Sequence, residues 1–172
     1  GQKHIETMIE KLKERFSIEI EVTEPKIPYR ETITSNAEGS YRHKKQSGGK
    51  GQFGEVHMRV RPKGRGEGYN FVDSIVGGSI PARFIPAVEK GVNETLVTGV
   101  ISGSLVVDLE VELFFGKFHD VDSSEMAFKI ASRTCFKDLF KKANPILLEP
   151  IYTVKVSVPE EYTGDIMGDI ST

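Results

Sequence analysis

One glycine-rich stretch organises this chain of 172 residues: it reads QSGGKGQF and runs from Gln46 to Phe53. Four glycines between positions 48 and 54 leave the backbone without Cβ atoms, so it can adopt positive φ angles and approach another surface closely. After them, from Gln52 to Pro62, apolar residues alternate with polar ones as in a half-buried strand. The pattern predicts the turn of a β-hairpin rather than the start of a helix.

Positive charge is concentrated around this turn. Residues 42–65 include eight Lys or Arg and one acidic residue, a local charge of +7, whereas the whole chain carries −2. Lys44 and Lys45 precede the glycines, and Lys50 lies among them. A bare, positive turn on a nearly neutral body favours a polyanionic partner, of which a ribose-phosphate backbone is the common example.

Two nucleotide-binding patterns overlap with the same glycines. The string GKGQFGEV at 49–56 satisfies the dinucleotide pattern G-x-G-x-x-G and the kinase pattern G-x-G-x-x-G-x-V. The dinucleotide pattern requires a helix to open at the glycines, but a strand is expected there. The kinase pattern also requires V-A-I-K, H-R-D and D-F-G, which the sequence lacks. A nucleotide site at 49–54 and a plain glycine-rich hairpin therefore stand as alternatives to polyanion binding.

Length and composition set wider bounds. A chain of this length usually makes one domain, sometimes with fragments of its neighbours. The single cysteine, Cys135, cannot form an internal disulfide, and the sequence shows no signal peptide and no long apolar run. These features favour a soluble cytoplasmic protein.

The first 24 residues are interpreted as the end of a preceding domain. Residues 4–16 place apolar side chains at helical spacing, and residues 18–22 alternate as a strand. A helix and one strand cannot bury both of their faces by themselves. Pro25 and Pro28 then predict a stiff junction, after which a new unit begins at Tyr29.

The remaining elements follow from periodicity and turn residues. A helix that ends near Ala143 has apolar residues on more than one stripe, so it is expected to pack on more than one side. Asp122 is expected to cap its N-terminus, with Glu125 as capping-box partner. The other expected elements are one long strand over 29–45 paired with 52–62, a strand over 69–75, a helix over 85–96 ending at Gly99, strands over 105–115 and 146–158, and a helix beginning within 163–170.

The loop before that capped helix offers polar groups in the order His-Asp-Val-Asp-Ser-Ser, residues 119–124. Its groups lie too close together in sequence for a good metal site, and a serine triad would need a G-x-S-x-G turn that is missing. A helix cap with an exposed histidine is the simple interpretation. If the strand over 105–115 runs antiparallel to the strand over 52–62, however, His119 reaches the same end as Gln46 and Lys50, and a composite tip results.

Several long strings resemble one family in the same order along the chain. They are YRETI (29–33), KKQSGGKGQFGEV (44–56), GGSIPARFIPAVEKGV (77–92), FHDVDSSEMAFKIA (118–131) and KKANPILLEPI (141–151), and they are similar to the fourth domain of elongation factor G, the translocation GTPase. The resemblance implies an α+β fold, a split β-α-β two-layer sandwich with a left-handed crossover. It further implies that 1–24 end the third domain, 25–148 form the fourth, and 149–172 begin the fifth.

The resemblance also implies a binding function, in which this chain catalyses no reaction. Such a domain enters the decoding centre of the ribosome, where it contacts the tRNA–mRNA complex and rRNA, with no membrane partner. The family's tip residues match Gln46, Gly48, Gly49 and His119; Ser47 and Lys50 are added on chemistry, with Lys44 and Lys45 in support. No catalytic residue, metal or cofactor is expected here, because GTP and Mg belong to the family's separate GTP-binding domain.

Two further expectations come from the same comparison of strings. The run RGEGYNFVDSI at 65–75 and His4 look more like elongation-factor-G-like paralogues, so a recycling or protection factor is an alternative parent. In the family, a later helix packs back on the fourth domain. This chain lacks that helix, so an exposed apolar patch is expected.

Overall fold

The computed structural model describes residues 1–16 and 27–171, so the strand expected over 18–22 lies outside the described residues. The chain divides into two compact units. Residues 28–150 form the larger one, and residues 1–27 with 151–172 form the smaller one.

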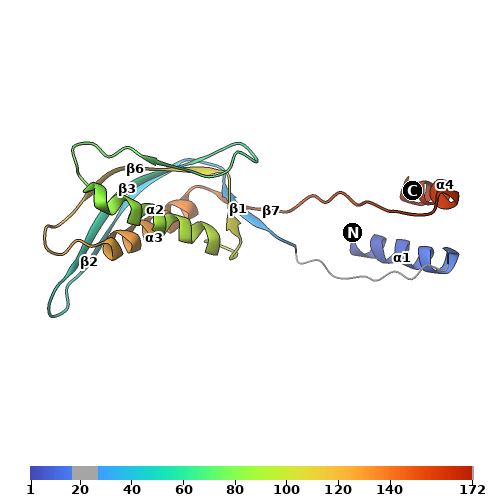
Figure 1. The fold of residues 1–172 in the computed structure, drawn as a ribbon, viewed down its shortest axis with the longest axis horizontal. Helices are drawn as coiled ribbons and strands as arrows, with labels where there is room; N and C mark the ends of the chain where they lie inside the picture. Colours follow the sequence, from blue (N-terminus) through green and yellow to red (C-terminus); the bar gives the residue numbers. More distant parts are fainter. Residues whose placement is uncertain (17–26, 172) are drawn as a thin grey trace. The chain divides into compact units, whose positions relative to one another are not determined.

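Two β-sheets make up the strand layer of the larger unit (Figure 1). In the four-stranded sheet, the second strand is antiparallel to its neighbours on both sides, and the edge strand at the far end is parallel to the strand beside it. Its order is β2 (Ala37–Lys45), β3 (Gln52–Pro62), β6 (Leu109–Lys117) and β4 (Asn70–Asp73). The three-stranded sheet has the order β5 (Leu105–Val106), β1 (Arg30–Ile33) and β7 (Pro145–Leu148).

Two helices form the second layer, α2 (Ile85–Thr98) and α3 (Glu125–Lys142), and they lie on one side of the four-stranded sheet (Figure 1). A single 3-10 turn, η1 (Ala82–Phe84), leads into α2. As expected from its apolar positions, α3 packs on more than one side, because it contacts β2, β3 and α2. Gly99, with φ of 74°, ends α2 as predicted.

The core lies between these two layers and follows from strand alternation. Every second residue of β3 and β6 faces the helices and is fully buried, and three phenylalanines of α3 fill the space opposite. The buried residues are Val56, Met58, Val60, Leu109, Val111, Leu113, Phe128, Phe136 and Phe140. The parallel pair β4 and β6, connected through α2, supplies the β-α-β unit, so the expected α+β fold class is confirmed.

Two expected strands are each broken in two. The strand expected over 29–45 forms β1 and β2 in different sheets, because the amide groups of Thr34 and Ser35 turn aside to donate to the carbonyl of Ala143. The strand expected over 105–115 forms β5 and β6, since Asp108 has a left-handed φ of 57°. The buried carboxylate of Asp108 accepts the amide hydrogens of Gly66 and Gly68, which stabilises that conformation.

Two other strands are shorter than expected. The strand expected over 69–75 is only β4, residues 70–73. The strand expected over 146–158 is only β7, and residues 149–158 have no regular secondary structure. A strand extends only where it has a neighbour, and β1, the partner of β7, has four residues that pair from Ile33–Pro145 to Arg30–Leu148.

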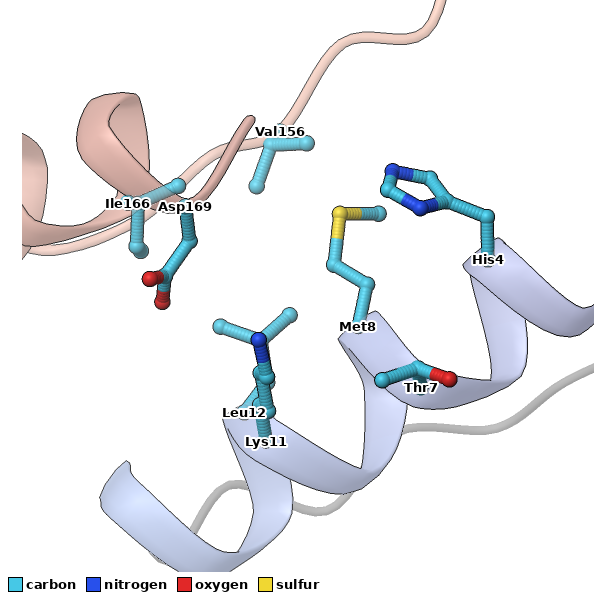
Figure 2. A pocket seen from close by; sticks show the side chains of 8 residues that line it. All are labelled: His4, Thr7, Met8, Lys11, Leu12, Val156, Ile166 and Asp169. Atoms are coloured by element: carbon cyan, nitrogen blue, oxygen red, sulfur yellow. The ribbon is translucent and has the colours of Figure 1, made fainter. Parts of the chain in front are cut away.

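The smaller unit consists of α1 (Gln2–Phe16), the 3-10 turn η2 (Glu160–Tyr162) and α4 (Thr163–Ser171). The helices expected over 4–16 and from 163 are therefore both present. A cavity of about 190 Å³ lies within this unit, and Figure 2 shows Met8 and Leu12 of α1 facing Val156 and Ile166 across it. None of the helices in the described part of the chain is long and apolar enough to cross a membrane.

Candidate nucleic-acid interface

The turn between β2 and β3 projects into solvent as far as Gly51, which is buried against Asp122. The ladder ends at the pair Lys45–Gln52, and residues 46–50 are exposed. Gly48 and Gly49 have φ angles of 46° and 112°, and a Cβ atom added to either would meet nothing within 4 Å. Their backbone conformation therefore requires glycine, whereas the space around them does not.

The loop that follows β6 is ordered around the His119 imidazole. The amide groups of Val121 and Asp122 both donate to its Nδ1 at 3.2 Å, and its own amide donates to Ser123 Oγ at 2.8 Å. Because both amides donate to Nδ1, this nitrogen acts as an acceptor and Nε2 is the ring nitrogen left to donate. With its side chain 56% exposed, His119 offers Nε2–H as a donor.

Hydrogen bonds join this loop to the start of β3. The amide of Phe53 donates to the Asp122 carbonyl at 3.0 Å, and Ser123 Oγ donates to the Phe53 carbonyl at 2.8 Å. The rings of Phe53 and His119 have centroids 6.4 Å apart. β3 pairs antiparallel with β6, which is the condition on which the composite tip depended, and this pairing brings His119 to the same end as residues 46–50.

The lysines around the turn keep their charges available. Lys44, Lys45 and Lys50 are exposed, and none of the ion pairs found between described residues includes them. Arg42 differs, because its Nε donates to the buried carboxylate of Glu55 at 2.8 Å. Burial by itself would raise the pKa of Glu55, but the hydrogen bond from Arg42 and the nearby His57 outweigh it and lower the pKa. Glu55 therefore stays ionised and holds Arg42, whereas no ion pair between described residues holds Lys44, Lys45 or Lys50.

The helix cap is not where the sequence indicated. Ser124 is the N-cap of α3, with extended φ and ψ of −148° and 163°, and its Oγ accepts from the amide of Ala127 at 3.1 Å. The prediction for Asp122 is wrong because α3 begins only at Glu125, while the amide of Asp122 is held by His119. Glu125 consequently lies in the first turn and is not a capping-box partner.

Sequence reasoning missed two participants, Ser123 and Phe53. The hydroxyl of Ser123 ties the two loops together by accepting from one and donating to the other. Two serines directly before a helix could have indicated a polar end to the loop. The contact between Ser123 and Phe53 depends on sheet register, so no local sequence pattern indicates it.

The glycines at 49–54 lack the helix that the dinucleotide pattern requires. They join two antiparallel strands, and the first α-helix to follow begins at Ile85. Fold and site together define a two-layer α+β domain that ends in a basic, glycine-rich tip with an exposed imidazole.

Comparison with known proteins gives the family. The family described as "Elongation factor G, domain IV" matches residues 25–144, and the chain belongs to it. An elongation factor G-like protein of Thermotoga maritima is 51% identical over 172 residues, which are 100% of this chain and 25% of that protein. A crystal structure of a Thermus thermophilus protein has a TM-score of 0.77 at 42% identity, over 99% of this chain and 25% of that one.

These comparisons confirm the resemblance drawn from the sequence strings. This chain spans about a quarter of the length of both relatives. Its family is thus defined by one domain of elongation factor G, not by the whole factor.

Proposed function

We propose that the larger unit enters the decoding centre of the ribosome and contacts the tRNA–mRNA helix and rRNA during GTP-dependent translocation. The observation that carries this proposal is the joining of two loops at one end of the sheet by Phe53, Asp122 and Ser123. This arrangement unites His119 with the basic glycine turn. The parent protein, in this proposal, is a cytoplasmic GTPase whose GTP and Mg are bound by another domain.

The chemistry of the tip suits RNA read by shape. A-form RNA presents 2′-hydroxyls and phosphates in a shallow minor groove, and these groups accept hydrogen bonds from amides and imidazoles. Gln46, Ser47, Lys50 and the backbone at Gly48 and Gly49 supply exposed donors. His119 adds a ring donor whose direction is fixed by the two amides on Nδ1.

The decisive experiment uses the full-length parent protein. His119→Ala should slow tRNA movement about tenfold, which corresponds to the removal of one neutral hydrogen bond of roughly 1.4 kcal/mol in the transition state. GTP hydrolysis should stay near wild type, and the domain should stay folded, because water can reach the Val121 and Asp122 amides that lose Nδ1 as acceptor. Lys141→Ala is the matched control, since Lys141 is exposed at the opposite end of α3 from the tip. Wild-type translocation by the histidine variant, or its unfolding, would refute this role.

The lysines are tested by salt dependence. Replacing Lys44, Lys45 and Lys50 with alanine should make the slope of log K against log salt for a structured RNA shallower by about 0.9 for each phosphate that the protein no longer neutralises. An unchanged slope would mean that these three side chains do not approach the RNA.

A second candidate function is a ribosome recycling or protection factor with the same fold. The observation in its favour is the 51% identical relative, whose name is "Elongation factor G-like protein". The same translocation assay separates the two functions, because a recycling or protection factor would not accelerate tRNA movement. For the nucleotide alternative, calorimetric titration of the 172-residue chain with GTP and ATP is the test. Micromolar binding would favour a nucleotide site at 49–54.

A further inference from the structure

The four-stranded sheet has an outer face, on the side away from α2 and α3. Near the tip, this face carries aromatic and charged side chains close together. Because side chains alternate, His57 and Glu55 of β3 lie on this face, opposite Phe115 and Lys117 of β6. On the other side of β3, Arg42 of β2 lies opposite Glu55. These five residues, together with Lys44, are called the outer-face cluster.

Aromatic rings gather at the middle of this cluster. The pairing of β3 with β6 is irregular between His57 and Met58, and the extra residue on β6 is Phe114. Both Phe114 and Phe115 consequently lie beside His57, with ring centroids 6.1 Å and 5.0 Å away and nearly perpendicular planes. The outward face of a two-layer sheet is normally polar, yet Phe115 is 39% exposed there.

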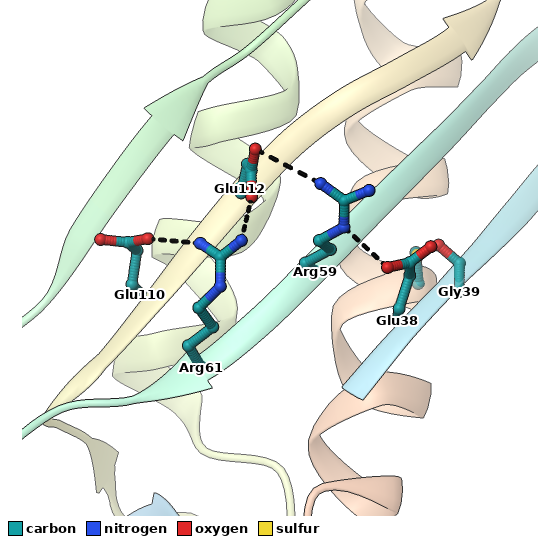
Figure 3. A network of polar contacts seen from close by, with 7 residues as sticks. Glu38, Gly39, Arg59, Arg61, Glu110 and Glu112 are labelled. Atoms are coloured by element: carbon teal, nitrogen blue, oxygen red, sulfur yellow. Dashed lines mark hydrogen bonds and ion pairs between the residues drawn. The ribbon is translucent and has the colours of Figure 1, made fainter. Parts of the chain in front are cut away.

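The charges around these rings favour an anion. Lys44 and Lys117 are exposed and take part in none of the ion pairs between described residues, while Arg42 and His57 share the single buried carboxylate of Glu55. Farther from the tip, the arginines of the same face are held in a ladder of ion pairs with glutamates, which Figure 3 shows. The ladder consists of Arg59 with Glu38 and Glu112, and Arg61 with Glu110 and Glu112.

We propose that the outer-face cluster is a second RNA-binding surface, which stacks an unpaired base against Phe115, holds a neighbouring phosphate with Lys117 and holds a phosphate farther along the strand with Lys44. Aromatic rings flanked by free cations are the means by which proteins bind single-stranded nucleic acid, since every base has a face to stack. A duplex does not fit, because its bases are already stacked. That the strand is RNA rests on the proposed ribosomal function, whereas the stacking site rests on the geometry alone.

The test is fluorescence anisotropy of the 172-residue chain with a labelled oligouridylate of about ten nucleotides, within the usual range of single-strand sites. Phe115→Leu keeps an apolar side chain but loses the ring, so it should bind about tenfold more weakly, whereas Phe115→Tyr should bind like wild type. Lys117→Ala should flatten the salt dependence by about 0.7, the value for one phosphate of a single strand. Lys141→Ala, on the helix layer, should change neither quantity. Binding of a blunt-ended RNA duplex, which has no unpaired bases, should be the same for Phe115→Leu and wild type.

A second measurement needs no variant. Ultraviolet cross-linking of oligouridylate containing 5-iodouridine to the wild-type chain should label Phe115 or His57. Labels confined to other surfaces would overturn the proposal, as would wild-type oligouridylate affinity in a folded Phe115→Leu variant. An equal loss of oligouridylate affinity in Lys141→Ala and Lys117→Ala would also overturn the proposal, because affinity would then depend only on the overall charge of the chain.

The outer-face cluster and the tip function can be refuted independently of each other. Normal translocation by the His119→Ala parent would refute the tip function without changing the effect of Phe115→Leu on oligouridylate. Wild-type oligouridylate binding by Phe115→Leu would refute the outer-face cluster and leave the tip function standing.

Discussion

The carboxylate of Glu31 holds the loop that follows α2, and replacing it with glutamine is predicted to be severely destabilising. Glu31 is only 1% exposed. One of its oxygens accepts the amides of Val100 and Ile101 at 2.9 and 2.8 Å. The other accepts the amides of Ser102 and Ser104 at 3.2 and 3.0 Å, and the Ser102 hydroxyl at 3.1 Å.

The size of the effect follows from these partners. Glutamine keeps one carbonyl oxygen, which can stay with Val100 and Ile101, but it turns an NH₂ group toward the amides of Ser102 and Ser104. Hydrogen bonds to a charged group contribute about 1.5–3 kcal/mol each, and the losses are less than additive. We expect Glu31→Gln to lower the free energy of unfolding by about 3 kcal/mol. For a domain of this size, that lowers the melting temperature by roughly 12 °C.

Urea denaturation followed by circular dichroism at neutral pH measures the loss. Glu38→Gln is the matched control, because Glu38 is an exposed glutamate of the same domain that pairs only with Arg59 among the described residues. Its loss should be under about 1 kcal/mol, as for other surface ion pairs. If Glu31→Gln costs no more than this control, the carboxylate does not hold the loop.

In acid, the difference in stability between Glu31→Gln and wild type should disappear. Burial alone would raise the pKa of Glu31, but the amides of Ile101, Val100, Ser102 and Ser104 outweigh burial and lower it below 4.5. The folded pKa is therefore below the unfolded one, so this stability is fully present above the unfolded pKa and is lost as pH falls through the folded pKa. The difference between wild type and Glu31→Gln should narrow as the pH falls below about 5. A difference that stays constant down to about pH 2 would contradict the lowered pKa.

Three more predictions concern the helix layer. Ser124→Ala should cost about 1 kcal/mol of stability through the lost N-cap, more than Asp122→Ala, and equal losses in urea denaturation would contradict the cap assignment. Gly91→Ala should destabilise by about 2 kcal/mol or more, because the added Cβ overlaps Ser132 Oγ, and a variant that melts like wild type would refute this close helix contact. Burial raises the pKa of the Cys135 thiol to about 12, so it should resist iodoacetamide at about pH 8 until urea unfolds the chain; rapid labelling of the native protein would show otherwise.

Much of the fold could be predicted because its signals are local. The glycines at 48–54 and the alternation over 52–62 lie within a few residues of one another, and they predicted the hairpin turn and β3. Apolar spacing likewise predicted α2 and α3. The composite tip was a conditional prediction that required only the antiparallel pairing of β3 with β6, which is present.

The sequence by itself determined the family, the order of the main elements and the concentration of positive charge at one turn, since each depends on residue types close together in the chain. Only the tertiary structure decided where the long strands break. The first expected strand breaks where the Thr34 and Ser35 amides donate to the Ala143 carbonyl. The second breaks at Asp108, whose carboxylate accepts the amide of Gly68, 40 residues away. The same holds for the join between Ser123 and Phe53. Periodicity reports which face of an element is apolar, whereas a buried carboxylate or hydroxyl takes whichever donor the folded chain brings to it.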